Sequence, residues 1–470
     1  MNKLENAVLI EPASPSIHFF RYARIPSLGL PILGALLRRM GLRVKIFCEH
    51  LAPIDWDTVA RADLVGISAL TNLAPRAYEI SRTVREMAAR MHRDITVVMG
   101  GPHPTSLPEE ALAQGVDFVV RGEGEKACER LVRGLRQGGG VDEIPGLSYR
   151  KGEEIRHNPG CLLTGDLDEL PFPDFSLIQG AERMTCTPLQ TSRGCPYDCE
   201  FCSVVPMYGR KVRQRSIEGV LEELKQTDPG KHVFLVDDNF SADPDRTQAL
   251  MEAMRAAGIK REWSTQERVS VAKRPDLLQK MRQAGCVILY LGLESMNPEA
   301  LDEWEKGQSP EDVEEAVSTI HAQGLWVHGM FVLGADADTP ASVNKTIQFA
   351  LRSGIDTAQF FVLTPPPGTR LYRRLNDAGR IFDHDWSHYD GQRVVHLPKR
   401  LSPWELQELS IEATRRFYNL RRAVSWGLRG RWKNAALAVY GRWLLGRWLR
   451  QQAPSLASLK EAGQGDSPCR

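Results

Sequence analysis

Long apolar stretches are missing from this sequence of 470 residues. No segment approaches the roughly 18 to 20 uncharged apolar residues that a membrane-spanning helix requires. The first six residues lead only into a short apolar run at 7–10, which is too short for the core of a secretory signal peptide. We therefore expect a cytoplasmic protein.

Cysteine is also scarce. The chain has nine cysteines, too few for the disulfide frameworks that hold small secreted domains together. Three of them, Cys195, Cys199 and Cys202, nevertheless lie within eight residues. In a reducing compartment such crowding indicates metal binding.

The formal net charge is only +1, but the charge is unevenly distributed. From Ala413 onward there are twelve Lys and Arg residues against two acids, a local charge of +10, and the preceding 412 residues carry −9. The basic tail also contains Trp426, Trp432, Trp443 and Trp448. This composition predicts either docking on a membrane surface or packing onto the acidic body or a second subunit. Nucleic acid is a disfavoured partner because no nucleic-acid module is recognisable.

The phosphate-binding patterns G-x-x-x-x-G-K-[ST] and G-x-G-x-x-G are absent, which disfavours nucleotide binding by the first third of the chain. There, short apolar runs alternate with helix-like segments. The runs that we expect to be strands lie at 7–10, 43–47, 64–68, 95–99 and 118–120. Continuous apolar runs are typical of strands buried on both faces, so residues 1–140 are predicted to form a doubly wound parallel sheet. Ligands bind such sheets beyond the carboxyl ends of the strands.

Residues 141–180 contain four prolines and are expected to form a linker. A second alternation of strand-like and helix-like segments follows. Its predicted strands lie at 233–236, 287–293, 325–333 and 358–363. The repetition predicts a complete or partial β/α barrel over residues 181–385, with its chemistry at the carboxyl ends of the strands. Residues 386–470 are predicted to be a helical C-terminal region that ends in the basic tail.

The crowded cysteines have the spacing C-x3-C-x2-C. Three thiolates on one short loop can converge on a single inorganic centre, and Gly194 and Pro196 favour such a loop. A four-iron cluster takes four protein ligands when it only carries electrons, so three ligands leave one iron open for a substrate or cofactor. Two alternatives stay open: a zinc knuckle with Cys186 or a histidine as fourth ligand, and an iron–sulfur electron carrier or sensor.

This spacing, with an aromatic residue just before the last cysteine, resembles the radical S-adenosylmethionine (SAM) superfamily. In that superfamily three cysteines hold a [4Fe-4S] cluster and SAM chelates the open iron. Electron transfer from the cluster then cleaves SAM to a 5′-deoxyadenosyl radical. The resemblance implies that Cys195, Cys199 and Cys202 are the metal ligands and that the backbone around Phe201 lies near the adenine.

The resemblance extends to the ends of the predicted barrel strands. It implies an acidic contact to the methionyl amino group after the second strand, polar contacts to the ribose after the fourth, and a close backbone approach to the adenosyl group at the fifth. The expected SAM-binding residues are Phe201, Asp237, Asp238, Glu294, Ser295, Gly329 and Leu363.

Two glycine-rich segments, at 100–105 and 122–125, close predicted strands in the first domain. Glycine there lets a bulky ligand approach the backbone. The arrangement resembles the Rossmann-like cobalamin-binding domain that precedes the radical SAM domain in many enzymes. The resemblance implies cobalamin contacts from Ser68, Thr71, Gly100, Gly101, His103, Thr105, Gly122 and Glu123.

One feature of cobalamin methyltransferases is missing. The segment at 11–18, which ends in His18, does not match D-x-H-x-x-G, the motif whose histidine ligates cobalt in those proteins. His103 lies in a different place and is not expected to be a cobalt ligand. Cobalamin is therefore expected on the strength of the glycine-rich segments alone.

Together these resemblances imply a cobalamin-binding domain followed by a partial (β/α)6 radical SAM barrel and a helical C-terminal region. We expect a cobalamin-dependent radical SAM enzyme that methylates an unactivated carbon of a lipid-like or natural-product substrate and is reduced by a flavodoxin or ferredoxin. The alternative is a radical SAM cyclase or carbon–carbon coupling enzyme with a structural first domain. The basic tail favours a peripheral contact at the inner membrane surface.

Overall fold

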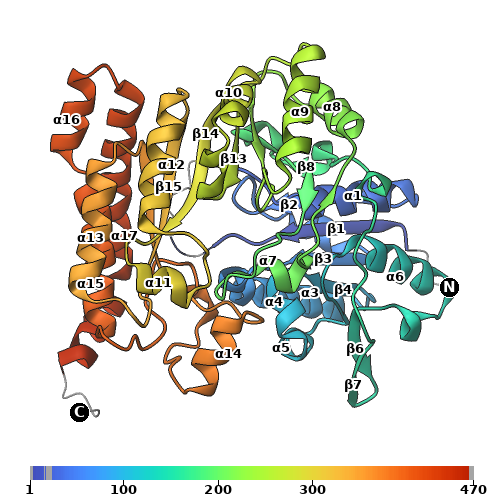
Figure 1. Cartoon of the computed structure of the whole chain (residues 1–470). Helices are drawn as coiled ribbons and strands as arrows, with labels where there is room; N and C mark the ends of the chain where they lie inside the picture. The colour runs from blue at the N-terminus through green and yellow to red at the C-terminus, as the bar shows by residue number, and fades with distance from the viewer. Residues whose placement is uncertain (1–3, 15, 17–23, 465–470) are drawn as a thin grey trace. The chain divides into compact units, whose positions relative to one another are not determined.

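The computed structural model describes residues 4–14, 16 and 24–464, with side chains up to residue 461 (Figure 1). His18 and the last six residues of the basic tail lie outside this part. The chain divides into two compact units. The first contains residues 1–15, 23–195 and 203–231, and the second contains residues 16–22, 196–202 and 232–470.

Among the described residues, the first unit forms an eight-stranded sheet with the order β7-β6-β5-β4-β3-β1-β2-β8. The strands are β1 (Asn6–Glu11), β2 (Arg43–Cys48), β3 (Leu64–Ser68), β4 (Thr96–Gly100), β5 (Phe118–Val120), β6 (Leu147–Lys151), β7 (Glu154–His157) and β8 (Ile178–Gln179). All neighbours pair in parallel except β6, which pairs antiparallel with both β5 and β7. The predicted doubly wound sheet is confirmed, and the range 141–180 supplies β6, β7 and β8.

The helices of the first unit are α1 (Gly29–Arg39), α2 (Trp56–Ala60), α3 (Ala74–Arg90), α4 (Pro102–Ser106), α5 (Pro108–Ala113), α6 (Glu125–Gln137), α7 (Val204–Tyr208) and α8 (Ile217–Gln226). Helices α1 and α6 contact each other, and their apolar faces join Leu9 and Ile46 of the sheet in one buried core. In the register of the sheet, Ser68 pairs with Gly100, and Gly100 pairs with Val120. The carboxyl ends of β3, β4 and β5 therefore lie at one edge of the sheet.

A short hairpin leads into the cysteine segment. After β9 (Cys186–Leu189), strand β10 (Ser192–Arg193) pairs antiparallel with β11 (Arg213–Gln214). Gly194 follows with φ +94°, and a Cβ atom there would lie 2.6 Å from the Lys211 carbonyl oxygen. Only glycine fits this left-handed, crowded position without distortion.

In the second unit, strands β12 to β16 lie side by side in chain order and are parallel. They are β12 (His232–Leu235), β13 (Trp263–Glu267), β14 (Cys286–Glu294), β15 (Trp326–Leu333) and β16 (Thr357–Val362). Four of them match predicted strands, and β13 was not predicted. Each strand is followed by at least one helix, which is the β/α repeat expected of a barrel.

The helices of the second unit are α9 (Pro244–Ala256), α10 (Pro275–Gln283), α11 (Pro298–Glu303), α12 (Pro310–Ala322), α13 (Pro340–Arg352), α14 (Arg370–Asp377), α15 (Pro403–Phe417), α16 (Leu420–Leu428) and α17 (Trp432–Gln464). Six of these begin with proline, whose fixed φ suits the first turn and whose missing N–H is not needed there. Ser309, Thr339 and Ser402 add capping boxes to α12, α13 and α15. Local sequence therefore sets where the helices begin.

The C-terminal helices pack onto the second unit. Helix α15 contacts β16, α13 and α17. The Tyr418 hydroxyl accepts a hydrogen bond from the Ala358 amide at 2.9 Å and donates one to the Ala358 carbonyl at 2.6 Å. Trp426 and Trp448 are buried, whereas Trp432 and Trp443 are exposed. The tail thus packs onto its own chain through some tryptophans and presents others to solvent.

No helix in the described ranges is both long enough and apolar enough to cross a membrane.

Candidate functional site

The cysteine loop is held by contacts to its backbone and to its acidic residue. The Glu200 amide donates to the Trp304 carbonyl at 3.2 Å, and the Glu200 carbonyl accepts from the Leu371 amide at 3.1 Å. Arg374 of α14 donates to both carboxylate oxygens of Glu200, at 2.7 and 2.9 Å. The last two cysteines are joined by a turn in which the Cys202 amide donates to the Cys199 carbonyl at 3.0 Å. These contacts fix the part of the loop around Cys199 and Cys202.

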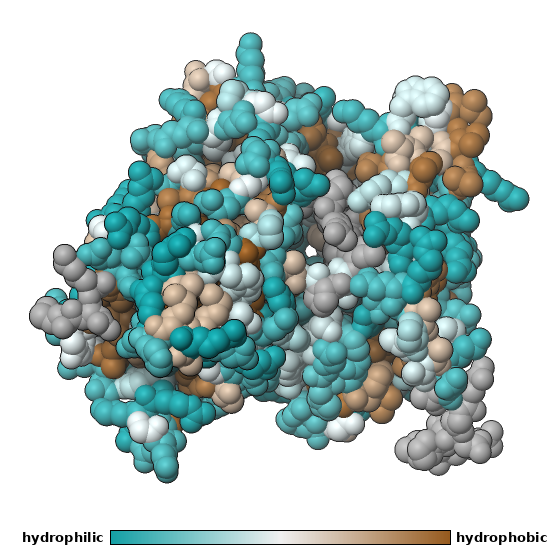
Figure 2. Space-filling model, turned by 180° about the vertical axis from the view of Figure 1, so that it is seen from behind, coloured by the Kyte–Doolittle hydropathy of each residue, from teal (hydrophilic) through white to brown (hydrophobic). Residues whose placement is uncertain are grey.

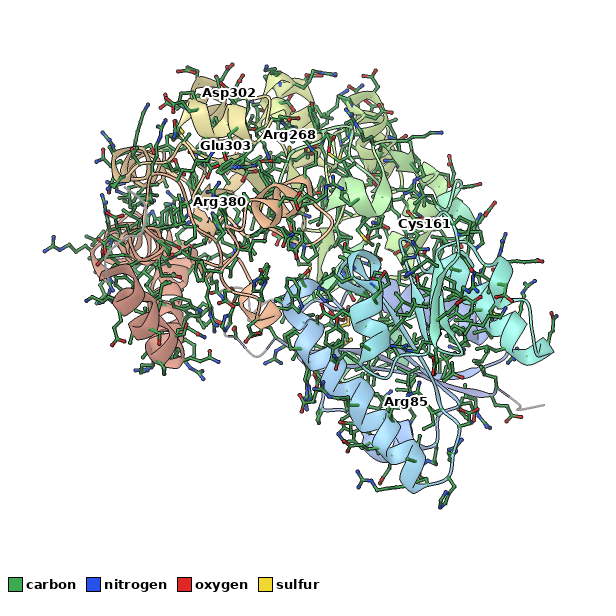
Figure 3. The ribbon with its side chains drawn as sticks, turned by 90° about the horizontal axis from the view of Figure 1, so that it is seen from below. Arg85, Cys161, Arg268, Asp302, Glu303 and Arg380 are labelled. Carbon is green, nitrogen blue, oxygen red and sulfur yellow. The ribbon has the colours of Figure 1, made fainter. Side chains whose placement is uncertain are left out.

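Arg268, which is labelled in Figure 3, lies beside Cys199. Its Nη1 lies 3.6 Å from the Cys199 Sγ, and its Nη2 donates to the Lys306 carbonyl. The guanidinium also lies 3.7 Å from the ring centroid of Tyr197. A buried positive charge so close to a thiol favours an anionic centre at this place.

Within the part of the chain that the structure describes, no three His, Cys, Asp or Glu side chains are grouped so as to hold a single metal ion. An iron–sulfur cluster is larger than one ion, so its ligands stand farther apart. Cys199 is buried, and Cys195 and Cys202 are partly exposed. Three soft thiol donors on one anchored loop, with a cation beside them, fit an anionic iron–sulfur cluster.

Two carboxyl groups meet at the carboxyl ends of β12 and β13. Asp237 and Glu267 are both buried, and the Glu267 Oε2 accepts a hydrogen bond from the Ser241 hydroxyl at 2.6 Å. Burial, together with the negative charge of Asp237, raises the pKa of Glu267 to about 8. Among the described residues, its Oε1 has no hydrogen-bond partner. A cation beside Glu267 would stabilise the ionised form of its carboxyl group.

Glu267 and Arg268 were missed by the sequence reasoning because β13 was missed. The spacing of the predicted strands could have revealed the missing strand. About 50 residues separate 236 from 287, and this interval is longer than one β/α unit needs. Asp238, the other predicted acid after β12, is partly exposed. The structure therefore adds a carboxyl group from β13 to Asp237, which was predicted.

The predicted ribose residues lie at the end of β14. Glu294 has a left-handed backbone, with φ +60°, and the pairing of β14 with β15 shifts register there. Its Oε1 lies 2.5 Å from the Lys306 ammonium nitrogen. The Ser295 hydroxyl accepts from the Asn297 amide at 3.0 Å. Both side chains are buried and already bonded within the protein.

The predicted adenosyl residues lie in apolar surroundings. A Cβ atom at Gly329 would come within 3.0 to 3.2 Å of the Leu293, Phe331 and Ile355 side chains, so the space beside this glycine is filled by the core. Leu363 belongs to a buried cluster with Trp304, and Phe201 packs against that cluster. The Phe201 and Trp304 rings meet edge to face, with centroids 5.6 Å apart.

In the first unit, most predicted cobalamin residues lie at the edge formed by the ends of β3, β4 and β5. Ser68, Thr71, Gly100, Gly101 and Thr105 are partly exposed. Gly101 has φ +103°, and a Cβ atom there would lie 2.8 Å from the Ala69 carbonyl oxygen. The Thr105 hydroxyl accepts from the Gly122 amide at 3.0 Å, which joins the two glycine-rich segments. Small residues and hydroxyl groups along a sheet edge suit a large polar ligand.

His103 and Glu123 differ from these residues because both are buried. The His103 Nε2 lies 2.9 Å from the Tyr78 hydroxyl, so this ring is bonded inside the unit. Glu123 is paired with Arg213 and Arg193.

Two protein families match the chain. The model of the radical SAM superfamily matches residues 189–350, and that of the B12 binding domain matches residues 21–132. The chain is 32% identical over 408 residues to an uncharacterised methyltransferase of Pyrococcus horikoshii, covering 84% of this chain and 88% of the relative. It is 28% identical over 404 residues to the bacteriochlorophyllide d C-12(1)-methyltransferase of Chlorobaculum tepidum, covering 84% and 82% of the two chains.

A solved structure shares the fold. It is the radical SAM methyltransferase TsrM from Kitasatospora setae with cobalamin and a [4Fe-4S] cluster bound, with a TM-score of 0.65 and 19% identity over 80% of this chain and 75% of that one. Anchored cysteines, the acidic strand ends and the glycine-rich sheet edge agree with the two matched families. The chain belongs to the radical SAM superfamily, as an enzyme that uses a [4Fe-4S] cluster and SAM, and it carries a B12-binding domain before the radical SAM domain.

Proposed function

We propose that this protein is a cobalamin-dependent radical SAM enzyme that methylates an unactivated carbon. One observation carries the proposal: an anchored three-cysteine loop and a B12-binding sheet edge occur in one chain, whose relatives include methyltransferases. When bound, the cluster and SAM supply a radical that removes a hydrogen atom, and cobalamin supplies the methyl group. The protein must place the reacting groups and exclude water.

Cys195, Cys199 and Cys202 would hold the cluster, leaving one iron for SAM. Arg268 would donate a hydrogen bond to the Cys199 sulfur, on the basis of their separation of 3.6 Å. Asp237, together with Glu267, would accept the amino group of SAM, because an ammonium ion would stabilise the ionised form of Glu267, whose pKa is raised by burial.

The remaining SAM contacts are assigned by position. Asp238 lies beside Asp237 and would add charge at the amino group. Glu294 and Ser295 would face the ribose, while the backbone of Phe201 and the side chain of Leu363 would bound the adenosyl group. Gly329 is left out because its surroundings are filled by the core. The buried cluster of Leu363 and Trp304 supports an apolar boundary on that side.

For cobalamin, we propose contacts along the edge formed by β3, β4 and β5. Ser68, Thr71 and Thr105 would hydrogen-bond the ligand, and Gly100, Gly101 and Gly122 would let it approach the backbone. His103 would hold the turn after β4 through Tyr78 and not bind cobalt, because its ring is fully buried.

The test is anaerobic reconstitution with iron, sulfide and cobalamin, followed by reduction in the presence of SAM carrying a labelled methyl group. We expect 5′-deoxyadenosine and, with the substrate present, a labelled product. A protein that assembles a cluster but never forms 5′-deoxyadenosine contradicts the proposal. Bound cobalamin without label in the product favours the cyclase or coupling alternative.

The substrate is proposed to be hydrophobic or a natural product. Support comes from the relative named as a bacteriochlorophyllide d C-12(1)-methyltransferase. A small electron-transfer protein such as flavodoxin or ferredoxin would reduce the cluster. Substrate extracts from cells with and without the gene, compared by mass spectrometry for a difference of one methyl group, would test the substrate class.

We also propose that the protein lies in the cytoplasm and touches the inner membrane surface through its C-terminal helices. Leu420, Val424, Leu428 and Trp432 repeat every four residues along α16 and into α17, and each is more than half exposed, with Leu428 at 85%. Figure 2 shows hydrophobic residues gathered over the end of the molecule that carries α16. The same two helices carry exposed basic residues: Arg421, Arg429, Lys433, Arg442, Arg447 and Arg450. Apolar side chains among arginines suit an anionic bilayer.

Point substitutions test this contact better than truncation, because the tail also carries the buried Trp426 and Trp448. We expect the full chain to bind phosphatidylglycerol vesicles more tightly than phosphatidylcholine vesicles, and the double change V424S and L428S to weaken that binding at least fivefold. L397S is the matched control, since Leu397 is an exposed apolar residue outside the tail. Unchanged binding of the double variant would contradict the contact.

A further inference from the structure

Four charged side chains from distant parts of the first unit meet in its interior. Glu123 precedes α6 and Glu125 begins it, while Arg193 and Arg213 lie directly opposite each other in the β10–β11 hairpin. Each of the four is at most 7% exposed. Because charged groups are almost never buried without partners, the contacts among them must stabilise the charges. We call these four residues the charge cluster.

The contacts within the charge cluster engage both carboxylate oxygens of Glu123. Arg213 donates to both of its carboxylate oxygens, with Nη1 3.0 Å from Oε2. The Thr164 amide donates to the same Oε2 at 2.8 Å, and the Arg193 Nη1 lies 3.4 Å from it. Glu125 accepts from the Arg193 Nη2 at 2.6 Å. Both carboxylate oxygens of Glu123 are therefore bonded inside the first unit, and the side chain is buried away from the sheet edge.

The charge cluster also controls where the cysteine loop begins. Arg193 stands two residues before Cys195, and the glycine between them closes the hairpin against Lys211. Two arginines opposite each other in a hairpin repel unless acids compensate them. The carboxylates of the Gly122–Glu125 segment thus hold together the hairpin from which the first cysteine emerges.

We propose that Glu123 and Glu125 are positioning residues for the cysteine loop, acting through Arg193 and Arg213, and are not contacts to cobalamin. The inference rests on the proposed function, in which Cys195 is a cluster ligand. A motif of the B12-binding domain then serves the iron–sulfur site of the same chain.

The experiment uses the full-length variants Glu123→Gln and Glu125→Gln, which keep shape and remove charge. Glu129→Gln is the matched control, because Glu129 lies on the same helix and pairs with the exposed Arg133. Three quantities are measured: cobalamin affinity by absorbance, iron and sulfide content with the EPR signal of the reduced cluster, and the alkylation rate of Cys195 in cluster-free protein by mass spectrometry.

We expect both charge-cluster variants to keep cobalamin affinity within about twofold of the native protein. Their cluster content should fall at least twofold, and Cys195 should be alkylated at least threefold faster. The control should match the native protein in all three. The double variant Glu123→Gln with Arg213→Gln, which restores charge balance, should recover part of the slow alkylation.

Two results would overturn the inference. Cobalamin affinity that falls tenfold while cluster content and alkylation stay native would make Glu123 a cobalamin contact. Equal losses of cobalamin affinity and cluster content would make the charge cluster a general element of the fold. If the native protein assembled no cluster, the proposed function would fail, whereas the alkylation rates would still decide the role of the charge cluster.

Discussion

Two sets of buried carboxyl groups in this protein have opposite electrostatic surroundings. Glu123 and Glu125 face two arginines, and although burial opposes ionisation, the bonds from Arg213 and the charge of Arg193 hold the pKa of Glu123 below its usual value. For Glu267, burial and the nearby charge of Asp237 raise the pKa. Both carboxylate oxygens of Glu123 are bonded, whereas the Glu267 Oε1 has no hydrogen-bond partner among the described residues. Glu267 is therefore the better candidate for a ligand contact.

The largest expected effect comes from breaking the compensated set. Glu123→Gln removes the carboxylate that pairs with the buried Arg213 and leaves Arg193 with Glu125, which should lower the free energy of unfolding by about 3 to 5 kcal/mol. Urea unfolding at neutral pH measures it. A loss below about 1 kcal/mol would show that these buried arginines do not depend on the carboxylate.

The second set should make stability fall as pH rises. The pKa of Glu267 is about 8 in the folded protein, against about 4.3 when unfolded. Between these values the folded state binds more protons, so its advantage is complete at low pH and is lost toward pH 8. The contribution should decline by about 3 kcal/mol between about pH 5.5 and 7.5, and Glu267→Gln should abolish that decline. Urea unfolding of ligand-free protein at several pH values measures it, and parallel curves for the variant and the native protein would contradict it.

Binding of a cation should favour the ionised form of Glu267, as the arginines do for Glu123. If the amino group of SAM binds at Asp237 and Glu267, it favours the ionised carboxyl group, so binding releases a proton. Affinity for SAM should then rise up to about tenfold from about pH 6 to pH 7, which is about 1.4 kcal/mol. Calorimetry in two buffers of different ionisation enthalpy detects the released proton. No proton release, or the same release in Glu267→Gln, would place the amino group elsewhere.

The smallest effect is expected where a carboxylate is paired but exposed. Glu129 and Arg133 form a surface pair on α6, and Glu129→Gln should change stability by less than about 0.5 kcal/mol. Urea unfolding of Glu129→Gln and Glu123→Gln under the same conditions compares their free energies of unfolding. A change as large as that of Glu123→Gln would mean that burial is not what separates the two pairs.

Strands with apolar sequences were predictable, and β13 shows why another was not. Its residues Trp263 to Glu267 are mostly polar yet mostly buried. The Ser264 hydroxyl bonds with the His232 ring at 2.7 Å, and the Thr265 hydroxyl donates to the Leu235 carbonyl at 3.0 Å. Both partners belong to the neighbouring β12, so the polar groups are satisfied only after the sheet forms. A reading based on hydrophobic pattern does not detect such a strand.

The residues of the candidate site also differ in how far they could be predicted from the sequence. The cysteine spacing is local, so the sequence indicates the loop directly. The charge cluster joins residues 123, 193 and 213, which lie far apart in the chain and meet only through the fold. The sequence therefore predicted Glu123 as a cobalamin contact from its motif alone, and the arginines that occupy its oxygens could not be foreseen.

The two hydrogen bonds between Tyr418 and Ala358 bear on whether the edge strand β16 can pair with a strand of another molecule. Strand β16 ends the order of strands in the second unit, so its outer backbone groups could pair with a strand from another molecule. The single hydroxyl of Tyr418 occupies both the amide and the carbonyl of Ala358, and α15 covers the strand beside it. Helix α15 and the tyrosine that follows it thus cover backbone groups that an open sheet edge would otherwise expose.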